Sequence, residues 1–198
     1  ELFKKWFSKA EKSEINDPNA VAVATSNKDN QPNVRMVLLK GLNNKGFVFY
    51  TNFNSKKGNE LKENQKASMC FHWKSLRRQV RAIGKVEEVS SEEADDYFNS
   101  RPYKNRIGAW ASSQSKILDK RESFLKNIEE YEKKYPDPDK VPRPPHWSGW
   151  RLLPEEIEFW LDGDGRIHER LNYRKRNGKW FKELLYPCLL YTSDAADD

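Results

Sequence analysis

The chain has 198 residues, with 36 Lys and Arg against 30 Asp and Glu, which gives a formal net charge of +6. This length is typical of one domain with a hydrophobic core, and the charge favours anionic partners, either phosphorylated small molecules or nucleic acid. Two cysteines exclude a disulfide framework, and three scattered histidines give no reason to expect a metal site. Because we find no secretory signal and no apolar run of membrane-spanning length, we expect a cytoplasmic protein.

The first half of the chain predicts a helix followed by five strands. Leu2, Phe3, Trp6, Phe7 and Ala10 fall on one helical face. Strands are expected over 20–26, 35–40, 47–51, 67–73 and 76–89, with a hairpin signal at 43–46 and a short helix over 55–64. Strands joined mostly by hairpins indicate an antiparallel sheet or barrel.

The second half predicts a helical insertion and then a return to strands. Ser90 and Glu93 have the spacing of a capping box, which predicts a helix to about Ser100. Further helices are expected over 103–111 and 119–135, a Pro-rich loop over 136–145, and strands over 150–153, 157–162, 166–176 and 179–185. The expected fold class is therefore mainly β with helices (α+β), a β-barrel split by a helical insertion.

The last eleven residues differ from the rest. Segment 188–198 (CLLYTSDAADD) contains three acids and no Lys or Arg, and it continues no predicted element. We interpret 1–187 as a single domain and 188–198 as an appended, non-native tail.

Three groups of side chains could bind anions. In the first, Arg35 and Lys40 flank four apolar residues that predict a buried strand, and Ser55, Lys56 and Lys57 open a helix whose donors suit a phosphate. The same strand could instead be an edge strand whose charges reach solvent.

The second group lies at a helix end, where Tyr97 and Arg101 are one helical turn apart and could grip a phosphate dianion. In the third, Arg166, His168 and Arg170 follow Trp160, and on a strand they would share one face. The second group could equally be a surface pair that covers the helix end. Gln79, Gln114 and Ser115 add neutral donors.

Taken together, the motifs resemble the pyridoxamine 5'-phosphate oxidase family. The matching segments occur in the family's order and are RMVLLK (35–40), FYTNFNSKKG (49–58), RRQVRAIGKV (77–86), YFNSRPYKNRIGAW (97–110), SSQS (112–115), PPHWSGWRL (144–152), IEFW (157–160) and GRIHERLNYRKR (165–176). The chain departs from the family pattern at Lys56, where Arg is usual, and at Asn105, where Ser is usual.

The resemblance implies a split β-barrel homodimer that holds FMN at its interface and oxidises pyridoxamine 5'-phosphate and pyridoxine 5'-phosphate to pyridoxal 5'-phosphate, with hydride loss to the flavin and reduction of dioxygen to hydrogen peroxide. The implied FMN contacts are Arg35, Met36, Val37, Leu38, Leu39, Lys40, Tyr50, Thr51, Lys56, Lys57, Gln79, Gln114, Ser115, Trp160 and Arg170. The implied substrate contacts are Lys40, Tyr97, Arg101, Asn105, Arg166 and His168, with Arg166 and His168 beside the reacting carbon.

Two rival functions compete with this interpretation. A split-barrel flavin reductase or carrier would keep the first group and lose the other two. A basic nucleic-acid-binding barrel would need aromatics interleaved with a continuous basic groove, whereas the cations here are in discrete groups.

Overall fold

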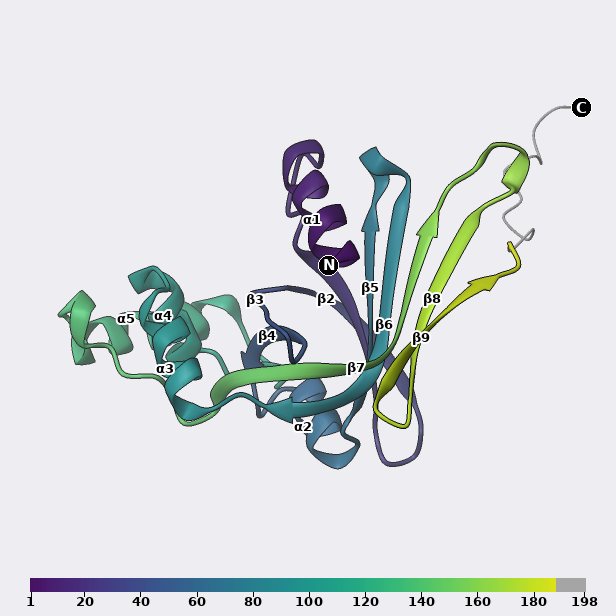
Figure 1. The fold of residues 1–198 in the computed structure, drawn as a ribbon. Coiled ribbons are helices and arrows are strands. Elements are labelled where there is room, and N and C mark those ends of the chain that lie inside the picture. The colour runs from purple at the N-terminus through teal and green to yellow at the C-terminus, as the bar shows by residue number, and fades with distance from the viewer. Residues whose placement is uncertain (188–198) are drawn as a thin grey trace, which may run out of the picture.

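The structure, a computed structural model, describes residues 1–187, which contain one curled antiparallel sheet and helices around it (Figure 1). The strands are β1 (Ala20–Ser26), β2 (Pro32–Leu38), β3 (Gly41–Leu42), β4 (Phe47–Asn52), β5 (Lys66–Trp73), β6 (Arg78–Glu88), β7 (Trp147–Leu161), β8 (Glu169–Arg176) and β9 (Lys179–Leu185). The helices are α1 (Leu2–Ser13), α2 (Lys56–Glu63), α3 (Ser91–Asn99), α4 (Tyr103–Ala111) and α5 (Arg121–Lys134), with 3₁₀ turns η1 (Lys74–Leu76), η2 (Pro138–Lys140) and η3 (Asp164–Arg166). This confirms the predicted α+β class.

Strand β7 pairs with three other strands of the sheet, β4, β6 and β8. The strand order is β2-β1-β5-β6-β7-β4-β3, and β8 and β9 extend from β7. The first half of β7 pairs with β4, and its second half pairs with β8. Strand β6 pairs with β7 along the whole of β6, over 78–88, and so spans both halves. We expected two strands here, over 150–153 and 157–162. The structure joins them because a register shift at Ile83 and Gly84 accommodates Pro154, and a Cβ on Gly84 would lie 2.0 Å from the Leu153 carbonyl oxygen.

The main hydrophobic core lies between α1 and the sheet. Phe3 is buried and its ring meets Phe47 at 4.9 Å and Phe71 at 5.0 Å, edge to face. A second core, under α3, α4 and α5, contains Phe98, Ile107, Val141 and Trp147. In Figure 1 this helical layer lies at one end of the molecule, around the start of β7.

Three sequence predictions were wrong in detail. Residues 35–38 belong to β2, which is an edge strand of this chain, so the alternative of an edge strand is confirmed and the buried strand is wrong; alternate residues Val34, Met36 and Leu38 are exposed. Residues 166–168 precede β8 instead of lying in it. Ser90 caps α3, but the Glu93 carboxylate pairs with Arg151, so the capping box is not reciprocal.

The tail prediction falls outside the described residues. Among residues 1–187, no helix has both the length and the apolar character that crossing a membrane requires.

Candidate functional site

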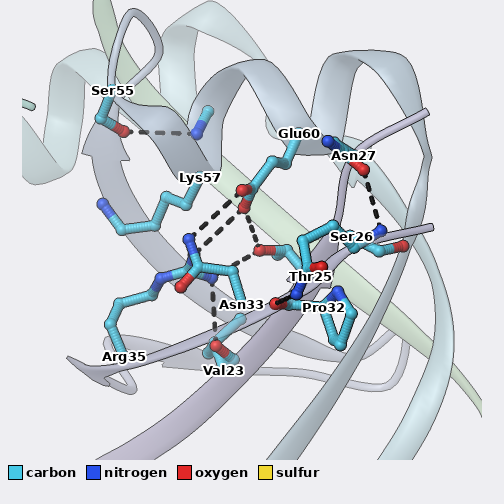
Figure 2. Close-up of polar contacts among 12 residues, drawn as sticks. Val23, Thr25, Ser26, Asn27, Pro32, Asn33, Arg35, Ser55, Lys57 and Glu60 are labelled. Atoms are coloured by element: carbon cyan, nitrogen blue, oxygen red, sulfur yellow. Dashed lines mark hydrogen bonds and ion pairs between the residues drawn. The ribbon is translucent and has the colours of Figure 1, made fainter. Parts of the chain in front are cut away.

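A basic cluster, defined here as Arg35, Lys57 and their polar partners Thr25, Thr51 and Glu60, lies between β1, β2 and the start of α2 (Figure 2). Arg35 Nη2 donates to Glu60 Oε2 at 3.1 Å, and Nη1 donates to Thr25 Oγ1 at 2.5 Å. Lys57 Nζ donates to Thr51 Oγ1. Thus β2 and α2, which are not paired with each other, supply two cations to one place.

The local sequence explains how Lys57 comes to be buried. Ser55 caps α2 by accepting a hydrogen bond from the Gly58 N–H, so the helix starts directly beneath the strand end. A Cβ on Gly58 would lie 2.4 Å from the Phe53 carbonyl oxygen, so only glycine allows the helix this close. Lys57 in the first turn is therefore held inside, whereas its neighbour Lys56 is exposed.

The electrostatics of the basic cluster favour an added anion. Burial, and then the charge of Arg35, lower the pKa of Lys57 from 10.5 to about 8. Burial works against the charged form of Glu60 as well, but hydrogen bonds from Thr25, Asn33 and Arg35 hold its pKa below the ordinary value. One carboxylate thus faces two cations, and a phosphate would stabilise the ammonium form of Lys57. This charge imbalance fits a phosphate-bearing cofactor.

The rest of the 35–40 segment lies around this cluster. Arg35 and Val37 point into the subunit, and Met36 and Leu38 point out from the edge strand. Leu39 is buried, and Lys40 is exposed beyond the end of β2, with its backbone N–H bonded to the Val48 carbonyl at 2.9 Å. The two cations that flank the apolar run are therefore placed differently: Arg35 points inward from β2, and Lys40 is exposed after the end of that strand.

A second cluster, the aromatic–arginine cluster, is formed by Tyr50, Tyr97, Arg101 and Trp147. The Tyr50 ring stacks on Tyr97 at 4.0 Å and on Trp147 at 5.3 Å, and the Tyr97 and Trp147 ring centroids are 6.1 Å apart. The Arg101 guanidinium lies 4.7 Å from the Trp147 ring centroid. Its Nη1 is buried and has no hydrogen-bond partner within residues 1–187. A half-buried guanidinium with one buried, unpartnered nitrogen beside flat rings is suited to a phosphorylated aromatic ligand.

Burial changes the acidity of this second cluster. It raises the pKa of Tyr50 to about 12, with Glu93 adding to the effect, and it raises the pKa of Tyr97. Burial lowers the pKa of Arg101. The hydroxyls therefore stay protonated at neutral pH as hydrogen-bond donors. Asn105, expected nearby, is exposed on α4.

A third cluster, the imidazole cluster, lies where β7 turns into β8. The His168 ring is 4.7 Å from the Trp160 ring, and its Nδ1 is 2.9 Å from Asp162 Oδ1. Arg170 donates from Nε to Glu158 Oε1 at 2.9 Å. Arg166 lies in η3 with a φ of 63°. The predicted single strand face is therefore wrong for Arg166 and His168, which are placed by a turn.

The predicted neutral donors lie in two different places. Gln79 pairs with Trp160 across β6 and β7, so it shares a sheet face with the third cluster. Gln114 and Ser115 are exposed in the connection after α4. The start of this connection is bonded to β4, because the Asn52 side-chain amide donates to the Ser112 carbonyl at 3.3 Å.

The second and third clusters lie at opposite ends of β7. Trp147 and Trp160 are thirteen residues apart, roughly 40 Å along an extended strand. Figure 1 shows the α3–α4 layer and the β7–β8 connection at separate ends of the molecule. A small ligand therefore cannot contact both clusters of the same chain.

Sequence reasoning missed several partners in these clusters: Thr25, Glu60, Trp147, Glu158 and Asp162. Glu60 follows Lys57 by three residues on α2, a spacing that places both on one helical face and could have revealed the pair. The others come together only through strand pairing and turns.

Comparison with known proteins identifies two family regions. Residues 7–135 match the family described as pyridoxamine 5'-phosphate oxidase, and residues 147–187 match the pyridoxine 5'-phosphate oxidase C-terminal dimerisation region. The chain is 61% identical over 188 residues to the pyridoxine/pyridoxamine 5'-phosphate oxidase of Pelagibacter ubique (strain HTCC1062), covering 94% of this chain and 90% of that protein. It is 55% identical to the protein of the same name from Agrobacterium fabrum, covering 94% and 91%.

Solved structures share the fold. PhzG from Burkholderia lata 383, in complex with tetrahydrophenazine-1-carboxylic acid, superposes with a TM-score of 0.89 at 30% identity, covering 94% of this chain and 91% of that one. A pyridoxamine 5'-phosphate oxidase-related, FMN-binding protein from Nostoc punctiforme superposes with a TM-score of 0.75 at 17% identity, covering 94% and 96%.

Proposed function

Because this chain belongs to the pyridoxamine 5'-phosphate oxidase family, we propose that it is an FMN-dependent oxidase that converts pyridoxamine 5'-phosphate and pyridoxine 5'-phosphate to pyridoxal 5'-phosphate. Dioxygen is reduced to hydrogen peroxide, and the amine substrate also takes up water and releases ammonia. The observation that carries this proposal is 61% identity over 94% of the chain to an oxidase of that name. The cytoplasm is the proposed location, and 1–187 the proposed domain.

The basic cluster fits the phosphate of FMN. Lys57 is buried with a lowered pKa, and Arg35 beside it is only partly offset by Glu60, so the cluster gains stability from an added anion. Arg35, Lys56, Lys57 and Thr51 are assigned to the phosphate end of FMN. The other FMN contacts are assigned to Met36, Val37, Leu38, Leu39, Lys40, Tyr50, Gln79, Gln114, Ser115, Trp160 and Arg170.

FMN supplies the redox chemistry when bound, accepting reducing equivalents from the substrate and passing them to dioxygen. The protein binds and orients. Arg101 and Tyr97, with Lys40 and Asn105, hold the substrate phosphate. The Arg101 Nη1, which has no hydrogen-bond partner within residues 1–187, can donate to a phosphate oxygen. Arg166 and His168 lie against the reacting carbon, where Arg166 supplies positive charge and His168 can hold a proton.

The working unit is a homodimer. The 147–187 region matches a dimerisation region, and a dimer can bring the aromatic–arginine cluster of one subunit to the imidazole cluster of its partner. One face of the sheet also supports association of two subunits. It carries a cross-strand row formed by Met36, Ala22, Cys70 and Arg81. It contains exposed Val34, Met36 and Ile83 and a hollow of about 140 Å³.

The test is an absorbance spectrum of the purified protein followed by a peroxide assay with pyridoxamine 5'-phosphate and, as control, unphosphorylated pyridoxamine. We expect flavin bands, hydrogen peroxide and aldehyde with the phosphorylated amine, and much slower turnover of the control. Flavin bands without peroxide would favour a reductase or carrier. A flavin-free protein that binds nucleic acid would contradict the proposal altogether.

A further inference from the structure

Asp162 lies between Arg77 and His168, directly after β7. Its Oδ1 is 2.9 Å from His168 Nδ1, and its Oδ2 forms an ion pair with Arg77 Nη2. The Asp162 and His168 side chains are 13% and 8% exposed, so this contact is largely shielded from water. A shielded carboxylate that contacts one nitrogen of an imidazole can fix both the ring orientation and the site of its proton.

The Asp162 carboxylate is itself held in place. Its backbone N–H donates to the Arg77 carbonyl at 3.1 Å, where β6 begins. The Arg77 side chain, which starts from a left-handed residue with a φ of 51°, returns to the carboxylate. Asp162 is therefore fixed by a neighbouring strand as well as by its own.

The loop after Asp162 brings His168 back to it. A Cβ on Gly163 would lie 2.2 Å from the Ile167 carbonyl oxygen, so the loop closes tightly. Gly165 and Arg166 both have positive φ, of 61° and 63°. The ring of Trp160 then lies 4.7 Å from the imidazole. These constraints leave the ring little rotational freedom.

Two groups compete for His168 Nδ1. The Gly163 backbone N–H is 3.3 Å away and would donate to an unprotonated Nδ1. The Asp162 carboxylate is closer, at 2.9 Å, and requires a proton on Nδ1. A charge-assisted hydrogen bond is about twice as strong as a neutral one, so Asp162 should determine where the proton resides.

We propose that Asp162, braced by Arg77, is a positioning residue that keeps the proton of His168 on Nδ1 and presents Nε2 to the substrate. This inference rests on the proposed function, because the proposed function is what assigns His168 to the reacting carbon of the substrate. Without Asp162, the Gly163 N–H is the partner of Nδ1 that remains within residues 1–187, so the proton should move to Nε2.

Nitrogen-15 NMR of the histidine rings in the flavin-loaded enzyme tests the proton position directly. The chain has three histidines, so His168→Gln assigns the His168 signal. We expect a protonated Nδ1 in the unaltered enzyme and an Nε2–H ring in Asp162→Ala. Asp162→Glu should restore part of the original signal, and Asp164→Ala, on the same exposed loop, should leave it unchanged. An unprotonated Nδ1 in the unaltered enzyme, or an unchanged signal in Asp162→Ala, would overturn the proposal.

Steady-state kinetics then separate this inference from the proposed function. A reacting group misplaced by about 1 Å can cost roughly 100-fold in rate. We expect Asp162→Ala to lower kcat by about 10- to 100-fold with a smaller change in KM, and Arg77→Gln to have a weaker effect in the same direction. If Asp162→Ala moves the proton but keeps full kcat, the positioning role is wrong. If His168→Gln keeps full kcat, the assignment of His168 under the proposed function fails, whatever the NMR result.

Discussion

Replacing Lys57 with Met tests the phosphate assignment through both stability and cofactor binding. Met keeps the length of the side chain and removes the charge. Lys57 is 7% exposed, donates to Thr51 and lies near Arg35. Burial and the Arg35 charge both disfavour its ammonium, which lowers its pKa to about 8.

The magnitude follows from proton linkage. Each pKa unit corresponds to about 1.4 kcal/mol, so a pKa of about 8 in place of 10.5 costs the flavin-free protein about 3 kcal/mol at pH 7. The unfolded chain keeps this proton up to pH 10.5 and the folded chain releases it near pH 8. The free energy of unfolding therefore rises with pH between these values, and the cost is fully present below pH 8.

We expect flavin-free Lys57→Met to be more stable than the unaltered protein at pH 7. The gain is about 2 kcal/mol once a lost hydrogen bond to Thr51, worth about 1 kcal/mol, is subtracted. This gain should fall to zero at about pH 10, and above pH 10.5 the unaltered protein should be the more stable by about 1 kcal/mol, because only the lost hydrogen bond then separates the two proteins. Urea unfolding at several pH values measures this difference in the free energy of unfolding. Lys56→Met, which changes the exposed neighbour, should show no such difference.

FMN occupancy should change in the opposite direction. Without the Lys57 ammonium, the variant should lose bound flavin on gel filtration, although the remaining holoenzyme keeps a nearly unchanged KM. If Lys57→Met retains FMN fully, the phosphate assignment is refuted. If the flavin-free variant is less stable than the unaltered protein at pH 7, the cost assigned to the buried Lys57 ammonium is wrong.

The remaining predictions concern the other clusters and the chain end. Arg101→Ala should raise KM for pyridoxamine 5'-phosphate by about 10- to 150-fold, since a charge-assisted hydrogen bond is worth about 1.5–3 kcal/mol; loss of flavin instead would show that Arg101 serves the cofactor. Arg166→Ala should lower kcat more than it raises KM, as expected of a group that acts on developing charge, and an effect on KM alone would contradict this role. Truncation after Pro187 should leave Tm and flavin content unchanged, and a large drop in either would prove 188–198 structural. Sedimentation should give a dimer, whereas a flavin-loaded monomer would remove the shared site.

The sequence alone determined most of the elements, because their signals are local. The strand Ala20–Ser26, the helix Tyr103–Ala111 and the strand Lys179–Leu185 after the Asn177-Gly178 turn have the predicted bounds. Periodicity and turn chemistry depend on neighbours within a few residues, so the chain order of such segments can be read directly. The chemical type of the site residues, cations and hydroxyls beside aromatics, was likewise evident.

Tertiary structure alone decided how these residues meet. Whether β2 lies at the edge of the sheet depends on which strands pair, and the local pattern of residues 35–40 leaves both possibilities open. The continuity of β7 past Pro154 depends on a register shift in β6, which lies some 70 residues earlier in the chain. Asp162 contacts His168 because a closed loop with two left-handed residues folds back on β7. Contacts of this kind arise from packing between distant segments, so the sequence specified their chemistry while the fold specified their geometry.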